Sequence, residues 1–154
     1  MAGIGVPRSS SVVIVAVMLL GGPVASGAQI AVIAHPDSEV TELSSAELRD
    51  LFVGRAATAG DAPVVLFENR GLRERFYPVA CGMGVRDVKR RWITVVLSGG
   101  GAEPPVEVEA EEVVERVAET PRSLSFVELA RVDGSVRVVR IDGRSPGDAE
   151  YPLR

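Results

Sequence analysis

Basic side chains are concentrated between residues 70 and 91, where seven of the 22 positions are arginine or lysine. Arg70 and Arg73 flank a predicted helix start. The first amides of a helix have no partner within it and carry about half a positive charge. Two guanidinium groups beside such amides predict a weak site for phosphate or a related oxyanion. The residues of this candidate site are Asn69, Arg70, Gly71, Leu72 and Arg73.

These arginines also have a simpler explanation. Lys89 is the only lysine, and alanine, glycine and valine are abundant, which indicates a high-GC coding bias. On this alternative the arginines cover the solvated face of a helix. We favour it for residues 86–91, whereas both interpretations stay open for Arg70 and Arg73.

Ser44 and Ser45 are secondary candidates for anion binding because their hydroxyls lie at another predicted helix start. Residues 43–48 read Leu-Ser-Ser-Ala-Glu-Leu, a capping-box pattern in which Ser44 accepts a hydrogen bond from the amide of Glu47. The Glu47 carboxylate reaches back to the amide of Ser44. Capping therefore explains Ser44 without a ligand.

No other motif indicates catalysis, a metal or a cofactor. His35 is the only histidine and follows a predicted strand, where a turn histidine exposed to solvent is expected. Residues 99–101 are three glycines, but they lack the Lys-Ser/Thr end of a phosphate-binding loop and a preceding strand. The acidic run at 103–119 fits no EF-hand spacing. We expect a protein that is not an enzyme.

The first 28 residues predict an export signal. Arg8 is followed by an apolar run at 11–20, a Gly-Gly-Pro break and the small residues Ser26, Gly27 and Ala28. The run is short for a membrane span, which takes about 20 residues. We expect cleavage after Ala28 and a periplasmic or secreted product with no stable membrane span. A signal retained as an anchor is the alternative.

The remaining 126 residues have the usual length of one domain. They carry 16 basic and 21 acidic side chains, a formal balance of −5, which argues against general nucleic-acid binding. Cys81 is the only cysteine, so an intramolecular disulfide is excluded. We place the domain at residues 29–142 and a loosely attached tail at 143–154, where glycine and proline are frequent.

The hydrophobic pattern predicts a mixed α/β fold. Continuous apolar runs indicate buried strands, and apolar residues spaced three or four apart indicate helices. Strands early, helices between them and strands again at the end favour a Rossmann-like mixed sheet with a largely parallel core, flanked by helices. Strands are expected at 29–34, 63–67, 124–127 and 136–141, and helices at 45–53, 70–81, 85–96 and 109–119.

The order of these segments resembles the short phosphate-binding-protein-like members of the type II periplasmic binding proteins, the substrate-binding proteins of ABC transporters. The resemblance covers roughly residues 29–140, and the helix ending in Leu-Phe-Val-Gly at 51–54 is its most specific part. The other matching segments are residues 30–37, 73–77, 91–92, 98–105, 113–121 and 124–127.

The resemblance implies one lobe of such a protein, with an oxyanion held by amides at helix starts together with hydroxyl and guanidinium groups. Two departures stand against it. The Ser-Gly-Thr turn of the family is replaced at residues 69–73, and the late Pro-Gly is Pro121-Arg122 here. We therefore expect weak binding of phosphate or a similar oxyanion. The alternative is a protein-interaction or structural accessory module of the envelope that keeps the fold and contacts a membrane transport or envelope protein.

Overall fold

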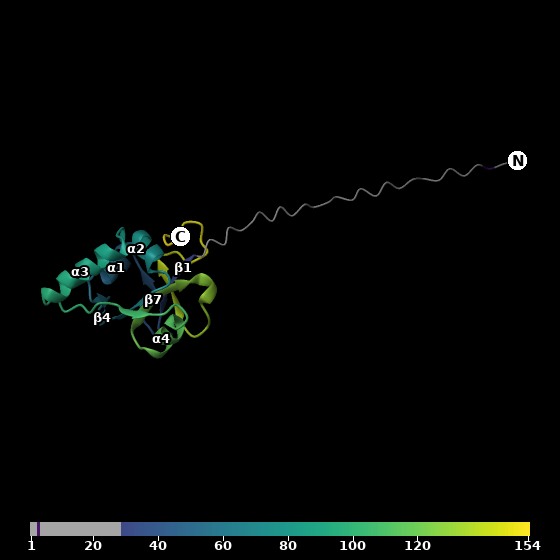
Figure 1. Ribbon diagram of the computed structural model, residues 1–154. Coiled ribbons are helices and arrows are strands. Elements are labelled where there is room, and N and C mark those ends of the chain that lie inside the picture. Colours follow the sequence, from purple (N-terminus) through teal and green to yellow (C-terminus); the bar gives the residue numbers. More distant parts are fainter. Residues whose placement is uncertain (1–2, 4–28) are drawn as a thin grey trace.

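The computed structural model describes Gly3 and residues 29–154, so the predicted export signal lies almost entirely outside the described residues. Six strands form one mixed sheet in the order β2-β8-β1-β7-β5-β6 (Figure 1). The strands are β1 (Ile30–Ala34), β2 (Glu42–Leu43), β5 (Val65–Asn69), β6 (Val106–Val108), β7 (Ser123–Glu128) and β8 (Arg137–Ile141).

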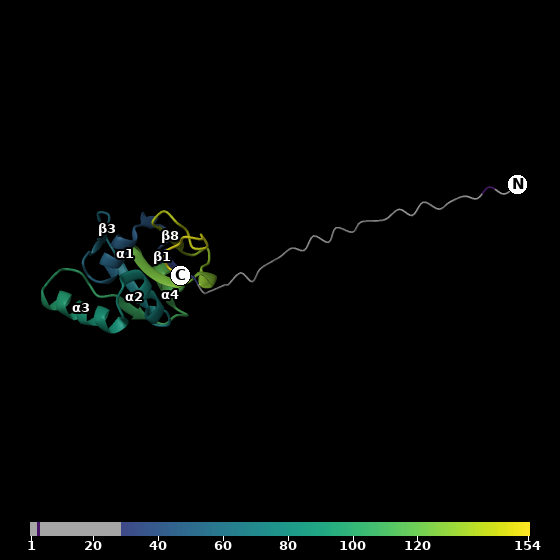
Figure 2. The ribbon, with the colours of Figure 1, turned by 90° about the horizontal axis from the view of Figure 1, so that it is seen from above.

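Helices cover both faces of this sheet, which confirms the predicted α/β fold with a mixed sheet flanked by helices (Figures 1 and 2). On one face, α1 and α2 pack on the side chains of β1 and β7 that point towards them. α3 lies beside α2 and adds Val88 and Trp92 to the same core. On the other face α4 packs on Ile33, Phe67 and Val127. The helices are α1 (Ser45–Phe52), α2 (Arg73–Cys81), α3 (Val85–Leu97) and α4 (Val113–Glu119), with a 3-10 turn at Leu129–Arg131.

The main core is built around four aromatic rings from α1, α2 and β7. Phe76 stacks on Phe126 with ring centroids 3.7 Å apart, and Phe52 meets both rings edge-on. Tyr77 adds a further edge contact to Phe126. All four side chains are fully buried, so this cluster fixes α1 and α2 against the middle of the sheet.

β1 is the central strand, and the sequence predicted its position but not its direction. All five of its side chains are buried, as a continuous apolar run indicates. It is antiparallel to both neighbours, β7 and β8, whereas the pairs β2–β8, β5–β6 and β5–β7 are parallel. The expectation of a largely parallel sheet is therefore wrong at its centre, because an apolar run has the same composition in either direction.

Several short elements differ from the predicted ones. The segment expected to be a loop at 55–62 contributes a small hairpin of β3 (Thr58–Ala59) and β4 (Ala62–Pro63). β6 was not predicted, and α4 begins at Val113 rather than at Glu109. Strands of two or three residues are too short to show a hydrophobic period. The short α4 follows turns that bring Glu109 back beside α2.

The end of the chain is packed, not loosely attached. Tyr151 and Leu153 are each 2% exposed and belong to the main core. The carbonyl of Leu153 also accepts a hydrogen bond from the amide of Ile30, at 3.3 Å. Glycine and proline are frequent in residues 143–154 because the segment turns, although its ends are packed on the domain. Within the described part of the chain, no helix is long and apolar enough to cross a membrane.

Because Leu153 fills a buried site, we expect Leu153→Ala to lower the free energy of unfolding by about 2–5 kcal/mol. Leu97→Ala is the matched control: Leu97 is 82% exposed, and its truncation should change stability by no more than about 0.5 kcal/mol. Urea denaturation followed by circular dichroism measures both values. Equal, small effects would show that the C-terminal segment is loosely held after all.

Candidate functional site

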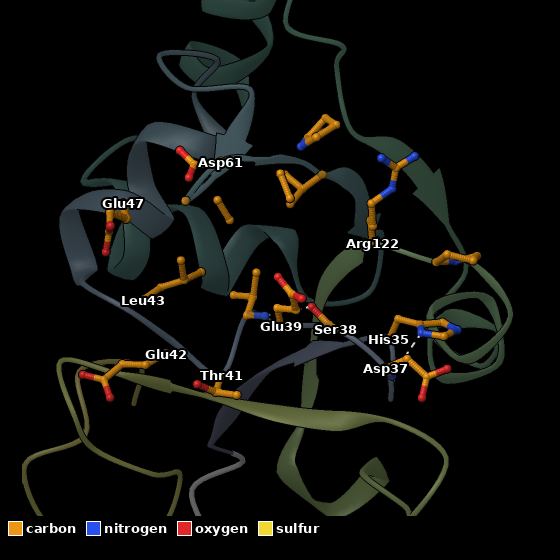
Figure 3. A pocket seen from close by; sticks show the side chains of 17 residues that line it. His35, Asp37, Ser38, Glu39, Thr41, Glu42, Leu43, Glu47, Asp61 and Arg122 are labelled. Carbon is orange, nitrogen blue, oxygen red and sulfur yellow. Dashed lines mark hydrogen bonds between the residues drawn. The ribbon is translucent and has the colours of Figure 1, made fainter.

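A cavity of about 810 Å³ opens beyond the carboxyl end of β1 (Figure 3). Residues of three segments line it: 35–43 after β1, 59–64 around the small hairpin, and 121–122 before β7. Glu47 of α1 completes the wall. The cavity thus lies where one central strand ends and its neighbour begins, a position at which loop side chains converge.

The turn after β1 holds His35 in a defined orientation. The His35 carbonyl accepts from the amide of Ser38 at 2.9 Å, and its Nδ1 accepts from the amide of Asp37 at 3.2 Å. A nitrogen that accepts a hydrogen bond carries no proton, so the neutral ring has its proton on Nε2 and can donate it to a ligand. His35 is half-buried and lines the cavity, so it is not simply the solvent-exposed turn residue expected from the sequence.

Arg122 belongs to the last of the three segments that line the cavity, and its backbone conformation is uncommon. Its φ is 60°, in the left-handed region, which costs a residue with a Cβ about 1–2 kcal/mol. The Arg122 carbonyl accepts from the amide of Val65 at 2.9 Å and so fixes the start of β5 beside β7. Within residues 29–154, no carboxylate lies at ion-pair distance from its guanidinium.

Charge is unevenly distributed around the cavity. In Figure 3, Arg122 and His35 lie on one side, and Glu42 and Glu47 lie on the other. Glu42 pairs with Arg140 at 2.9 Å. Hydrogen bonds from the amide and hydroxyl of Ser44 hold the pKa of Glu47 below its usual value. Of the described residues in the lining, Arg122 is the one arginine or lysine. The carboxylates in the lining are Asp37, Glu39, Glu42, Glu47 and Asp61.

The predicted site at residues 69–73 forms a compact turn between β5 and α2, but its amides are engaged. Asn69 is the last residue of β5, and its Oδ1 accepts from the amide of Gly71 at 3.0 Å. Its Nδ2 donates to the carbonyl of Phe126, and its own carbonyl accepts from the amide of Leu72. The helix expected from residue 70 begins at Arg73, and its N-cap is Leu72, which makes no side-chain capping bond.

Both arginines of this turn are paired with carboxylates. The guanidinium of Arg73 lies 3.1 Å from Glu68 and 3.1 Å from Glu107. Arg70 contacts Glu107 at 3.7 Å and Glu109 at 2.5 Å. These pairs neutralise the two guanidinium groups on which the predicted oxyanion site depends.

Glu68 explains why Arg73 is held inside. Glu68 is only 4% exposed, and its second carboxylate oxygen accepts a hydrogen bond from the hydroxyl of Tyr77. Burial, together with the negative charge of Glu68, raises the pKa of Tyr77, so this hydroxyl stays a donor. On the exposed side, the ammonium of Lys89 lies 2.7 Å from Glu107 and lowers the pKa of that carboxyl. The network joins β5 and β6 to α2 and α3.

Ser44 and Ser45 do not join the turn at 69–73 in a common site. Ser44 forms the predicted capping box with Glu47. The amide and hydroxyl of Ser45 both donate to the carboxylate of Asp142, and these bonds lower the pKa of Asp142. Neither serine lines the cavity. Among residues 29–154, no three His, Cys, Asp or Glu side chains are grouped closely enough to hold a metal ion.

Sequence reasoning gave little weight to Arg122 and His35. A usable signal was present at Arg122, because the family that the sequence resembles is expected to have glycine there, and glycine accepts a φ near +60° without strain. Arg122 adopts this backbone conformation and places a guanidinium on it. His35 carried no comparable signal, because one histidine after a strand has no defined spacing to another reactive group.

No family model matches the sequence, and no curated protein matches it. Solved structures do match the fold. A phosphate ABC transporter substrate-binding protein of Clostridium perfringens, with bound phosphate, is 19% identical over 77% of this chain and 46% of its own, with a TM-score of 0.62. PstS of Borrelia burgdorferi is 14% identical over 77% of this chain and 49% of its own, with a TM-score of 0.57.

An ABC-type phosphate transport receptor of Vibrio cholerae is 15% identical, with a TM-score of 0.53 over 77% of this chain and 48% of its own. The chain has the fold of phosphate-transporter substrate-binding proteins. It spans about half the length of the structures that it matches, in agreement with the single lobe expected from the sequence.

We expect the removal of Arg73 to lower the free energy of unfolding more than the removal of Arg70. Arg73→Ala leaves the carboxylate of Glu68 buried without a counter-ion, and we expect a loss of about 3 kcal/mol in unfolding free energy. Arg70→Ala removes a half-exposed pair and should cost less than about 1 kcal/mol. Chemical denaturation measures both, and adding Glu68→Gln should recover part of the Arg73→Ala loss. A stable Arg73→Ala protein would mean that the buried carboxylate of Glu68 does not depend on this guanidinium.

Proposed function

We propose that this chain is an exported, non-enzymatic binding domain that takes phosphate or a related oxyanion weakly in the cavity beyond β1. The proposal places the ligand beside Arg122 and His35, not at the turn formed by residues 69–73. Export rests on the predicted signal at residues 1–28, with a periplasmic or secreted product.

The observation that carries this proposal is the guanidinium of Arg122, which lies at the cavity and has no carboxylate at ion-pair distance among residues 29–154. Strained backbone at a residue with a Cβ is concentrated at functional sites, because the surrounding structure must maintain it. A guanidinium binds an oxyanion through two parallel hydrogen bonds, and Nε2 of His35 supplies a further donor on the same side. The similarity to structures named for phosphate transport supports the same ligand class.

Weak binding follows from the remaining lining. Asp37 lies on the same side of the cavity as His35, and further carboxylates occupy the rest of the wall (Figure 3). Their repulsion opposes a dianion even where they are partly neutralised. The chain spans only about half the length of the matched structures, so it builds the cavity from fewer segments than a protein of their length contains.

A second candidate is an envelope interaction or accessory module that keeps the fold without binding a small molecule. The internal pairing of Arg70 and Arg73 favours it, because the guanidinium groups at the start of α2 serve structure. Its partner would be a transport or envelope protein at the membrane. The two candidates are separated by whether any oxyanion stabilises the fold.

Thermal unfolding in phosphate, against chloride at the same ionic strength, tests the first candidate. A ligand at 100 times its dissociation constant adds about 2.7 kcal/mol of stability, so millimolar phosphate should raise the melting temperature measurably if binding is weak but specific. Arg122→Gly should abolish this response. The same change should keep or raise stability without ligand, since glycine accepts the left-handed backbone without strain.

Arg131→Ala is the control for loss of one positive charge, because Arg131 is exposed and does not line the cavity. It should retain the wild-type response to phosphate. Stabilisation that survives in Arg122→Gly would place the ligand elsewhere. The absence of any response to phosphate or sulfate in the wild type would leave the interaction module as the better account.

A further inference from the structure

The outer face of α3 is basic in the first half of the helix and apolar in the second half. Residues spaced three or four apart form one line on this face: Arg86 and Arg90 in the first half, and Ile93 and Leu97 in the second. Ile93 is 61% and Leu97 82% exposed, and Val96 beside them is 54% exposed. Apolar side chains are thus presented to solvent at one end of a helix that is basic at the other.

This face is separate from the oxyanion cavity and is not needed for the core. The inner face of α3 packs through Val88 and Trp92, whose indole donates to the carbonyl of Phe52 at 2.9 Å. In both Figure 1 and Figure 2, α3 lies at the periphery of the molecule, with no other element outside it. A cavity of about 470 Å³ between α3 and Pro104 and Pro105 extends the apolar surface.

The charge on α3 is strongly biased towards positive. The helix carries four basic side chains, Arg86, Lys89, Arg90 and Arg91, against the single acidic Asp87. Asp87 pairs with Arg90 at 3.5 Å on the surface, and Lys89 pairs with Glu107. In the described part of the chain, no carboxylate pairs with Arg86 or Arg91. The protein as a whole is acidic, so this helix is a local exception.

We propose that α3 docks the protein on an anionic phospholipid surface, with Ile93, Val96 and Leu97 entering the acyl region and the arginines contacting lipid phosphates. Exposed apolar side chains next to basic ones are what an interfacial helix presents to such a surface. The charge complementarity favours lipid over a second copy of this chain, since lipid phosphates are anionic, whereas the α3 of a second copy offers Asp87 as its one acidic side chain. The contact is peripheral and reversible.

Sedimentation with vesicles tests the proposal on the full chain. Vesicles of phosphatidylcholine with 30% phosphatidylglycerol should bind the protein, and vesicles of phosphatidylcholine alone should bind it several-fold less. The double variant Ile93→Ser, Leu97→Ser should lower the partition coefficient at least about tenfold, because two exposed apolar side chains are lost from the contact. Arg86→Glu should weaken binding to the anionic vesicles only, and raised salt should do the same.

Val79→Ser is the matched control, because Val79 is a 46% exposed apolar side chain on α2, away from this face. It should bind as the wild type does, and every variant retains the same N-terminal residues. Equal binding by the Ile93, Leu97 variant, indifference to phosphatidylglycerol, or a dimer that this variant abolishes would each overturn the proposal.

Discussion

The buried carboxylate of Glu68 determines what the start of α2 can do. A charge this far from solvent needs a counter-ion and hydrogen-bond donors, and Arg73 and Tyr77 supply them. Glu107 then holds Arg73 from the other side and brings Arg70 and Lys89 into the same network. The helix start that looks suited to an anion from its sequence is therefore already neutralised by the protein itself.

The proposed binding cavity lies at the other end of the sheet from this network. The cavity beyond β1 is bounded by a strand end, a hairpin and the strained turn at Arg122, none of which is needed to neutralise a buried charge. The guanidinium of Arg122 has no carboxylate at ion-pair distance within residues 29–154 and is available to a ligand. Within the lobe, one arginine cluster thus serves the fold, and a single arginine elsewhere supports the proposed binding.

Much of the fold was predictable from local patterns. The capping box at Ser44, the glycine after α1 and the break at residues 82–84 give unambiguous helix boundaries, and the structure confirms them. Gly54 has a φ of 74°, and a Cβ there would lie 2.9 Å from Trp92. The direction of β1, the short strand β6 and the burial of Leu153 were not predictable, because each depends on contacts between distant segments.

The candidate site was less predictable than the fold for the same reason. The basic residues were visible in the sequence, but Glu107 and Glu109, which neutralise Arg70, lie more than 30 positions away and reach it only through β6. Residue type at a helix start therefore indicated capacity to bind an anion, whereas the pairing of its arginines depends on the tertiary structure, and anion binding at residues 69–73 stays a prediction. Arg122 differs, since it lines the cavity and has no carboxylate at ion-pair distance among residues 29–154.

The most direct test of whether Arg122, and not Arg70 or Arg73, is available to an anion is a phosphate titration of the ¹⁵N-labelled protein, followed by its amide chemical shifts. We predict that the amides of residues 35, 37–41, 122 and 123 shift together in a saturable manner, while those of residues 69–73 stay unchanged. Saturable shifts centred on residues 69–73, with the cavity amides unmoved, would contradict the account.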